Sequence, residues 1–138
     1  MKKQISFAVI TVVLFAALVN LASCEKDSGK LPNISFKTGA GYVSKDTTLA
    51  AGTAFTVGIS ATKAETQDVL KTFNITKAIG TAAATNVQSI TLTSAQGDSY
   101  SQDFPFTAGT TGTTETYTFT VSNRDGLVNS VTVKITVN

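Results

Sequence analysis

The chain has 138 residues, with 11 basic and nine acidic side chains, one cysteine and no histidine. This length suits a single domain, and the lack of histidine excludes Ser-His-Asp triads, histidine bases and histidine-based metal sites. The basic residues form no cluster of the kind that nucleic-acid-binding domains carry, so we expect no nucleic-acid partner.

The first 23 residues have the order of a secretory signal peptide. Lys2 and Lys3 give a positive start, residues 5–19 form an almost unbroken apolar run, and small residues then lead to Cys24. The apolar run is shorter than the roughly 20 residues that a membrane-spanning helix needs. The sequence therefore predicts a leader at residues 1–23 that directs export.

The end of this leader, Leu21-Ala22-Ser23-Cys24, resembles the lipobox of bacterial lipoproteins. The resemblance implies cleavage between Ser23 and Cys24 and acylation of the Cys24 thiol. An ordinary secretory signal followed by an incidental cysteine is the alternative, and Ser23 would suit that cut site too. After cleavage, nine basic and nine acidic side chains remain, because Lys2 and Lys3 leave with the leader.

Residues 24–31 are mostly polar or flexible and show no periodic apolar face, which predicts a tether. The lipobox resemblance implies that this tether is lipidated at Cys24. Acidic residues just after the lipidated cysteine act as a surface-export signal in Bacteroidetes, and Glu25 and Asp27 resemble a weak form of it, interrupted by Lys26. A plain polar linker is the alternative. The folded domain is then expected at residues 32–138.

The rest of the chain alternates between apolar and polar residues with period two, which indicates half-buried strands. The polar positions are mostly threonine, which suits a pleated surface. The clearest runs are residues 33–37, 55–62, 72–76, 89–93, 116–122 and 130–137. Phe119 and Val133 are expected to face the core. Asp125-Gly126 predicts a hairpin turn, residues 78–85 and 108–114 predict loops, and residues 63–71 form at most one helical turn.

About seven or eight short strands in one domain predict an all-β, immunoglobulin-like β-sandwich. The last two strands and their Gly-containing turn resemble the closing hairpin of PKD-like and other immunoglobulin-like domains. In that resemblance Tyr117 is a candidate tyrosine-corner residue whose hydroxyl returns to the backbone a few residues upstream. The chain departs from antibody-type domains, since it has no tryptophan and no cysteine pair, and it lacks the PKD Trp-Asp pair.

The whole chain resembles the small immunoglobulin-like lipoproteins of Bacteroidetes, which carry such a leader, a Cys-Glu-Lys-Asp start and one sandwich domain. The resemblance covers leader and domain, but its motifs are motifs of fold. It implies an exported binding or assembly module at the cell envelope, on the outer membrane and facing either the periplasm or the surface, and it implies no reaction.

Candidate site residues are few. Asp98 and Asp103 could act as a carboxylate pair if they stood across a cleft, although solvated surface acids are the commoner case. Calcium ligands could come from Asn123, Asp125 and Asp98, but no D-x-D-x-D run occurs, so we expect no metal and no cofactor. Pro105 predicts an edge strand or a bulge.

Sugar binding would need exposed aromatic rings, and the candidates by position are Tyr42, Tyr100 and Phe106, for which core or edge packing is the simpler interpretation. We therefore expect a non-catalytic envelope lipoprotein module, attached to the membrane through Cys24, with a glycan or an envelope protein as partner. The alternative is a small envelope hydrolase that uses a carboxylate pair.

Overall fold

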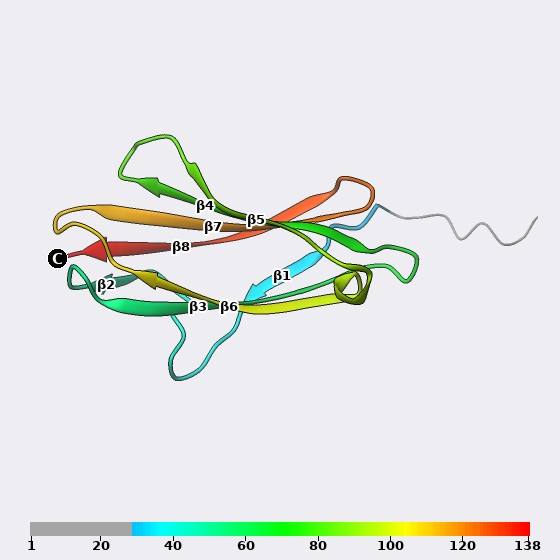
Figure 1. Ribbon diagram of the computed structural model, residues 1–138, viewed down its shortest axis with the longest axis horizontal. Helices are drawn as coiled ribbons and strands as arrows, with labels where there is room; N and C mark the ends of the chain where they lie inside the picture. The colour runs from blue at the N-terminus through cyan, green and yellow to red at the C-terminus, as the bar shows by residue number, and fades with distance from the viewer. Residues whose placement is uncertain (1–28) are drawn as a thin grey trace, which may run out of the picture.

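A computed structural model describes residues 29–138. Eight strands and one short 3-10 turn make up this part of the chain (Figure 1). The elements are β1 (Asn33–Phe36), β2 (Thr47–Leu49), β3 (Ala54–Thr62), β4 (Leu70–Ile79), β5 (Thr85–Thr91), η2 (Ser94–Gln96), β6 (Ser99–Thr107), β7 (Thr114–Asn123) and β8 (Val128–Val137).

The strands form two sheets that pack face to face (Figure 1). One sheet has three strands in the order β1-β3-β6, and the other has five in the order β2-β8-β7-β4-β5. All neighbouring pairs are antiparallel except β2 and β8, which run parallel. The predicted all-β, immunoglobulin-like β-sandwich with seven or eight strands is therefore confirmed.

The core lies between the two sheets and follows from the period-two pattern. In β7 every second side chain is buried, from Glu115 to Asn123, while the residues between them are partly exposed. Phe119 and Val133 are both fully buried, as the alternation predicts. Phe119 packs against four other rings, those of Phe36, Phe73, Phe104 and Phe106.

Two segments that the sequence left ambiguous contain no α-helix. Residues 63–69 contain a turn in which Asp68 N–H donates a hydrogen bond to the Glu65 carbonyl (3.2 Å). β4 begins directly after these residues. The expected loop at residues 78–85 is shorter than predicted, because β4 continues to Ile79 and β5 begins at Thr85. Ala78 and Ile79 pair with Thr116 and Glu115 of β7, whereas residues 80–84 form the turn to β5.

The two ends of the sandwich are distinct (Figure 1). The first described residues lie at one end, beside the β7–β8 turn, and the C-terminus lies at the other, beside the β2–β3 and β6–β7 connections. No helix within residues 29–138 has the length and hydropathy to cross a bilayer.

Candidate functional site

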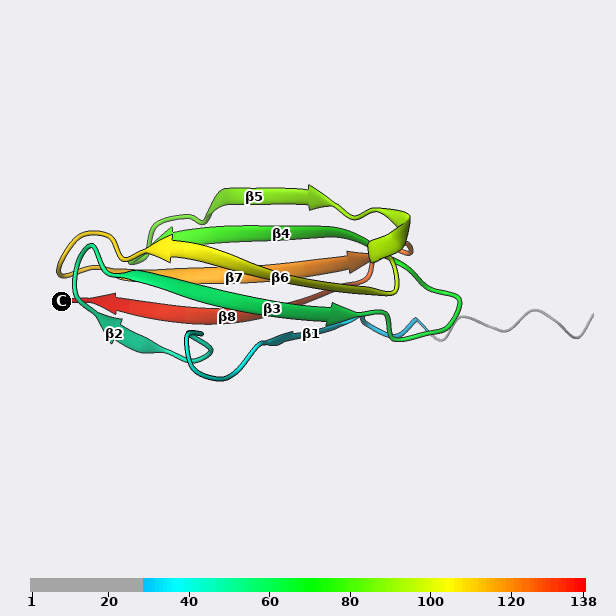
Figure 2. The same cartoon turned by 60° about the horizontal axis from the view of Figure 1, so that its bottom comes forward.

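The two sheets differ in width, and this difference leaves one side of the sandwich open. On that side the edge strand of the narrow sheet is β6, and the edge strand of the wide sheet is β5. Figure 2 shows β5 standing beyond β6, and no strand within residues 29–138 lies across from it in the narrow sheet. The inner face near β5 is therefore not covered by a strand of this part of the chain.

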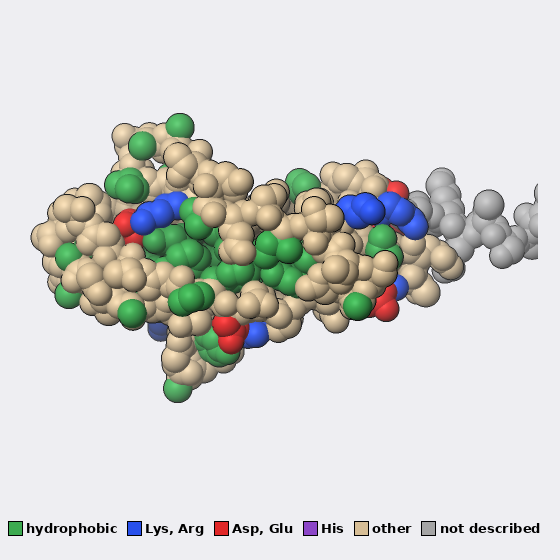
Figure 3. Space-filling model, viewed as in Figure 1, with side chains coloured by type: hydrophobic (Ala, Val, Ile, Leu, Met, Phe, Trp, Pro, Cys, Tyr) green, Lys and Arg blue, Asp and Glu red, His purple; other side chains and the backbone are tan. Residues whose placement is uncertain are grey.

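A groove of about 450 Å³ lies between these two edges. Its lining includes the apolar side chains of Ile90, Phe104 and Pro105 and the ring of Tyr100, together with three amides, Gln88, Gln96 and Gln102. Figure 3 shows hydrophobic side chains gathered in a band along this face, between β5 and β6. Among the described residues that line the groove, Asp103 alone is charged.

Pro105 occupies the edge strand β6, as the sequence predicts. The bonds from Lys63 N to Asp98 O (3.1 Å) and from Ala108 N to Thr53 O (2.9 Å) fix which residues of β6 bond to β3. The alternation of an antiparallel ladder then turns the backbone groups of residues 99, 101, 103, 105 and 107 toward the open edge. Proline at such a position removes no ladder bond.

Asp98 and Asp103 are held apart by separate partners. Asp98 forms an ion pair with Lys63 (2.6 Å) at the start of β6, whereas Asp103 lies inside β6 and forms an ion pair with Lys37 (2.7 Å). Five residues of extended strand span about 17 Å, well beyond the roughly 5–9.5 Å between the carboxyl groups of glycosidase pairs. The structure does not bring the candidate carboxylate pair together.

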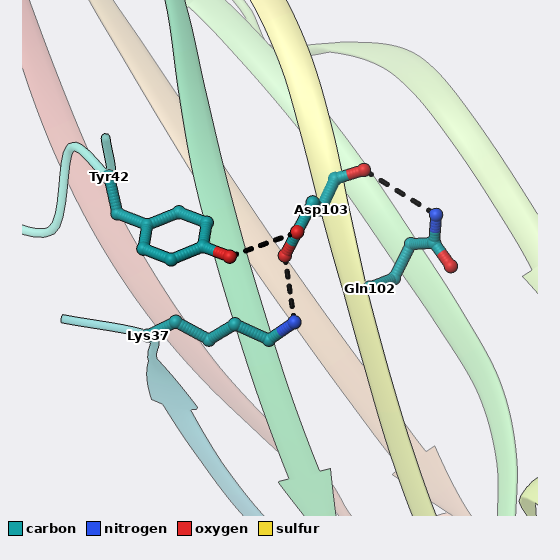
Figure 4. Close-up of polar contacts among 4 residues, drawn as sticks. All are labelled: Lys37, Tyr42, Gln102 and Asp103. Atoms are coloured by element: carbon teal, nitrogen blue, oxygen red, sulfur yellow. Dashed lines mark hydrogen bonds and ion pairs between the residues drawn. The ribbon is translucent and has the colours of Figure 1, made fainter. Parts of the chain in front are cut away.

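Asp103 belongs instead to a cluster on the outer face of the narrow sheet, with Lys37 and Tyr42 (Figure 4). The Tyr42 hydroxyl donates to Asp103 Oδ2 (3.0 Å), and the Lys37 ammonium donates to Oδ1. These two contacts hold the pKa of Asp103 below its ordinary value, with the Lys37 bond the larger cause. The hydrogen bond to Asp103 in turn raises the pKa of Tyr42.

Gly58 makes this cluster possible, since it lies on β3 beneath the Lys37 and Tyr42 side chains. A Cβ atom at Gly58 would stand 2.8 Å from Lys37 Cδ and 2.8 Å from Tyr42 Cε1. The chain leaving β1 also bonds along β3, from Lys37 N to Gly58 O (2.8 Å) and from Val43 N to Thr56 O (2.8 Å). The cluster therefore fastens the β1–β2 connection to the sheet and does not line a cleft with Asp98.

The three aromatic candidates for sugar stacking do not form an exposed platform. Tyr100 is 4% exposed, and Phe106 is half-buried with its ring 4.6 Å from that of Tyr117. Tyr42 is half-buried and bonded to Asp103. Core and edge packing account for all three rings.

The residues considered for calcium are also separately engaged. Asn123 donates to Asp68 Oδ2 (2.6 Å) and accepts from Leu127 N (2.7 Å), Asp98 pairs with Lys63, and Asp125 lies 3.6 Å from Arg124. Within residues 29–138 there is no group of three or more His, Cys, Asp or Glu side chains that could hold a metal ion.

Sequence reasoning missed a buried ionic network at the other end of β7. Glu115 is 1% exposed, forms an ion pair with Lys77 Nζ (2.7 Å) and accepts a hydrogen bond from the Tyr117 hydroxyl (3.0 Å). The Lys77 ammonium also lies 5.2 Å from the centre of the Tyr117 ring. The signal was present in the sequence, because Glu115 shares the inward phase of Tyr117, Phe119 and Val121.

This network corrects the tyrosine-corner prediction. The Tyr117 hydroxyl bonds to the Glu115 side chain two residues upstream and not to the backbone. A buried carboxylate is a stronger acceptor than a neutral carbonyl. The hydrogen bond from the Tyr117 hydroxyl therefore offsets part of the free-energy cost of burying the Glu115 carboxylate.

Ionisation of buried tyrosines predicts how stability changes at high pH. Burial raises the pKa of Tyr100 and of Tyr117. Burial alone would lower the pKa of Lys77, but its hydrogen bonds to Glu115 and Tyr117 raise that pKa above its ordinary value. Groups whose pKa is raised on folding contribute stability below their unfolded values, about 10, and lose it as the pH rises through the folded values.

We therefore expect the free energy of unfolding to be steady near neutral pH and to fall above about pH 10. Urea unfolding at pH 7, 9 and 10.5, with tyrosinate absorbance followed in parallel, measures this. Native tyrosine absorbance that rises at the same pH as in unfolded protein would contradict the prediction. Tyr117→Phe, which keeps the ring, serves as the variant that should weaken the dependence.

The candidate lipidation residue Cys24 and the expected cleavage site at Ser23 lie outside the described residues. Their assignment depends on the sequence pattern alone.

Comparisons with known proteins show the fold. No protein-family description matches the chain, and no curated protein matches it. Among solved structures, superoxide reductase (neelaredoxin) from Ignicoccus hospitalis aligns with a TM-score of 0.53, 9% identity and coverage of 79% of this chain and 81% of that one. A point variant of the same reductase gives 0.54, 8%, 78% and 80%. Spo0M, a sporulation control protein from Bacillus subtilis, gives 0.44 and 12%, covering 78% of this chain and 49% of that one.

Proposed function

We propose that this protein is a non-catalytic binding or assembly module of a bacterial cell envelope, attached to the outer membrane by lipid on Cys24. The observation that carries the proposal is the groove between β5 and β6, whose lining combines apolar side chains with three amides. Such a combination of apolar surface and a few polar groups is typical of binding sites.

The charges of the domain fit binding better than catalysis. Each acid considered for catalysis forms an ion pair with a lysine, Asp98 with Lys63 and Asp103 with Lys37. A general acid or base needs a free carboxyl group within reach of its substrate. Apart from Asp103, which is paired with Lys37, and Tyr100, the groove contributes amide and apolar side chains, which can bind and orient a ligand but move no protons at neutral pH.

The anchor belongs to the proposal because of the leader pattern. The likeness of residues 1–27 to the small immunoglobulin-like lipoproteins of Bacteroidetes supports a lipid at the N-terminus. The first described residues lie at one end of the sandwich. The tether would therefore join the domain at that end, and the groove would lie along its side.

Lipidation gives the first test of the anchor. Cys24→Ala should remove fatty-acid labelling completely and leave the protein unprocessed or released from membranes, because the acylated thiol is then missing. Metabolic labelling with a fatty acid, followed by membrane fractionation, measures both effects. Equal labelling of the wild type and Cys24→Ala would overturn the lipoprotein assignment, and Ser23→Ala, which keeps a small residue before the cut, is the matched control.

Photo-crosslinking in intact cells tests the groove. A photo-reactive amino acid at Gln102, in the groove, should give a discrete product that the same group at Thr132, exposed on β8 of the opposite sheet, does not give. Glycosidase digestion that returns the product to the size of the uncrosslinked protein identifies a glycan, whereas a product that resists glycosidase identifies a protein partner. Identical products from both positions would contradict a binding role for the groove.

A substrate screen tests the absence of catalysis. Processed protein is expected to show no turnover of glycoside, ester or peptide substrates, with or without EDTA. Turnover that Asp98→Asn or Asp103→Asn abolishes would replace the binding module with the carboxylate hydrolase.

A further inference from the structure

Within residues 29–138 the narrow sheet lacks a strand on its open side. It has three strands against five in the wide sheet, and β5 extends past β6 with no described strand facing it (Figure 2). The groove of about 450 Å³ occupies the place where the side chains of a fourth strand would lie. A strand added beside β6 would cover Ile90, Tyr100 and Phe104.

The backbone of β6 is prepared for such an addition. The ladder phase turns the N–H and C=O groups of Ser99, Ser101 and Asp103 toward the open edge. Their N–H groups have no hydrogen-bond partner among residues 29–138. Near them, the Gln102 side-chain amide lies 3.5 Å from the Asp103 carbonyl (Figure 4), in the place of an incoming N–H donor. Unpaired edge groups of this kind are templates for strand pairing.

The other three edges of the sandwich are poorer templates. β2 has three residues and β1 has four, and the chain leaving β1 is fastened along β3 by the Lys37 cluster. β5 changes register against β4 between Ile75 and Thr76, and a bulge at an edge hinders further pairing. By contrast, β6 keeps one register with β3 over nine residues, and Pro105 limits the free run to residues 99–103.

We propose that β6 accepts an extended segment of a partner protein as a fourth strand, through the backbone of Ser99, Ser101 and Asp103. The inference rests on the proposed binding function and specifies the class of partner, an extended segment of another protein. The segment alternates, with apolar side chains entering the groove and polar ones facing solvent. Its inward residues carry no charge, because the carboxylate of Asp103, the one charged residue of the described lining, lies on the outer face of the sheet in its pair with Lys37.

Two other occupants fit less well. The processed chain has only five residues before Gly29, and these begin at the expected lipid; residue 29 leads into β1, on the opposite side of β3 from β6. A second whole copy would bring two overhanging β5 strands to the same edge (Figure 2), whereas a single extended segment avoids this contact.

The test uses the processed, lipidated protein in detergent micelles and a capped nine-residue peptide in which valine alternates with threonine. Titration with ¹⁵N-labelled protein should shift the amide signals of Ser99, Ser101 and Asp103 saturably, and their hydrogen exchange should slow. A saturable response confined to the wide sheet, or no response at all, would overturn the proposal.

N-methylated peptides separate backbone pairing from apolar adhesion. In an antiparallel addition the threonine N–H groups face β6, and in a parallel addition the valine N–H groups do. Methylating one set should therefore weaken binding at least about tenfold, since several hydrogen bonds are lost together, while methylating the other set should not. Equal effects of the two methylated peptides would contradict strand addition.

Ser101→Pro provides the protein-side variant. It removes one outward N–H at a position equivalent to Pro105, so the ladder with β3 stays intact, and it should abolish peptide binding. If this variant fails to fold, the methylated peptides still decide. If the unsubstituted protein binds no peptide but still gives a discrete crosslink at Gln102 in cells, strand addition is refuted and the binding function stands. If it gives neither, both are refuted.

Discussion

Replacing Phe119 with alanine is expected to lower the free energy of unfolding by about 3–5 kcal/mol, as truncation of a fully buried phenylalanine does. Phe119 is 0% exposed, and its ring centre lies 5.9 Å from that of Phe36 and 6.1 Å from that of Phe104. Truncating its side chain leaves a cavity in the core between the two sheets. Since small domains are stable by about 5–15 kcal/mol, the variant should be close to unfolding.

Thr118→Ala is the matched control on the other face of the same strand. Thr118 is half-exposed, and its hydroxyl lies 3.1 Å from that of Thr132 on the solvent side. Its loss should cost less than about 1 kcal/mol. Urea unfolding of both variants measures the difference, and equal destabilisation would mean that β7 does not turn Phe119 inward and Thr118 outward.

The strands that form the core were predictable because their alternation is strict. In residues 117–121 of β7 and 131–137 of β8 a hydrophobic side chain recurs at every second position, so a one-residue slip would expose the whole set. Phe119 and Val133 could be assigned to the core from that pattern alone. The edge strand β5 follows a weaker pattern, since only Ile90 within it is even half-buried.

The groove could not be predicted from the sequence. It exists because the two sheets have unequal widths, and sheet order depends on pairings between distant segments such as β3 with β6. The Lys37 cluster is equally non-local, since Lys37 and Asp103 are 66 residues apart. Pro105 was the one local sign of the open edge, because proline is confined to edges and bulges.

The inward position of Glu115 could have been read from the sequence, but its partner could not. Alternation places Glu115 in phase with Tyr117, which marks it as a buried acid in need of a cation or donors. Lys77 lies on β4, opposite Tyr117 in the ladder, and this pairing depends on the register between β4 and β7. A bulge near Leu70 and Thr72 shifts that register, and no local sequence motif predicts this bulge.

Glu115→Ala is expected to cost about 2–4 kcal/mol. Removing one member of a buried ion pair costs about 3–5 kcal/mol when the other is left fully buried, and the Lys77 side chain is 24% exposed, so its ammonium still reaches water. The Tyr117 hydroxyl would lose its acceptor as well. Urea unfolding at neutral pH measures the change, and a cost below about 0.5 kcal/mol, the range of ordinary surface substitutions, would show that the pair is not buried in solution.

A double-mutant cycle between Gly109 and Glu115 tests the packing around the buried carboxylate. A Cβ atom at Gly109 would collide with Glu115 Oε1, so Gly109→Ala should destabilise the wild type by about 1–3 kcal/mol through overpacking. In the Glu115→Ala background the colliding oxygen is gone, and the same substitution should cost little. Residues in contact show such coupling and distant ones do not. Additive costs in the double variant would therefore separate Gly109 from Glu115 and contradict the packing at this end of the sandwich.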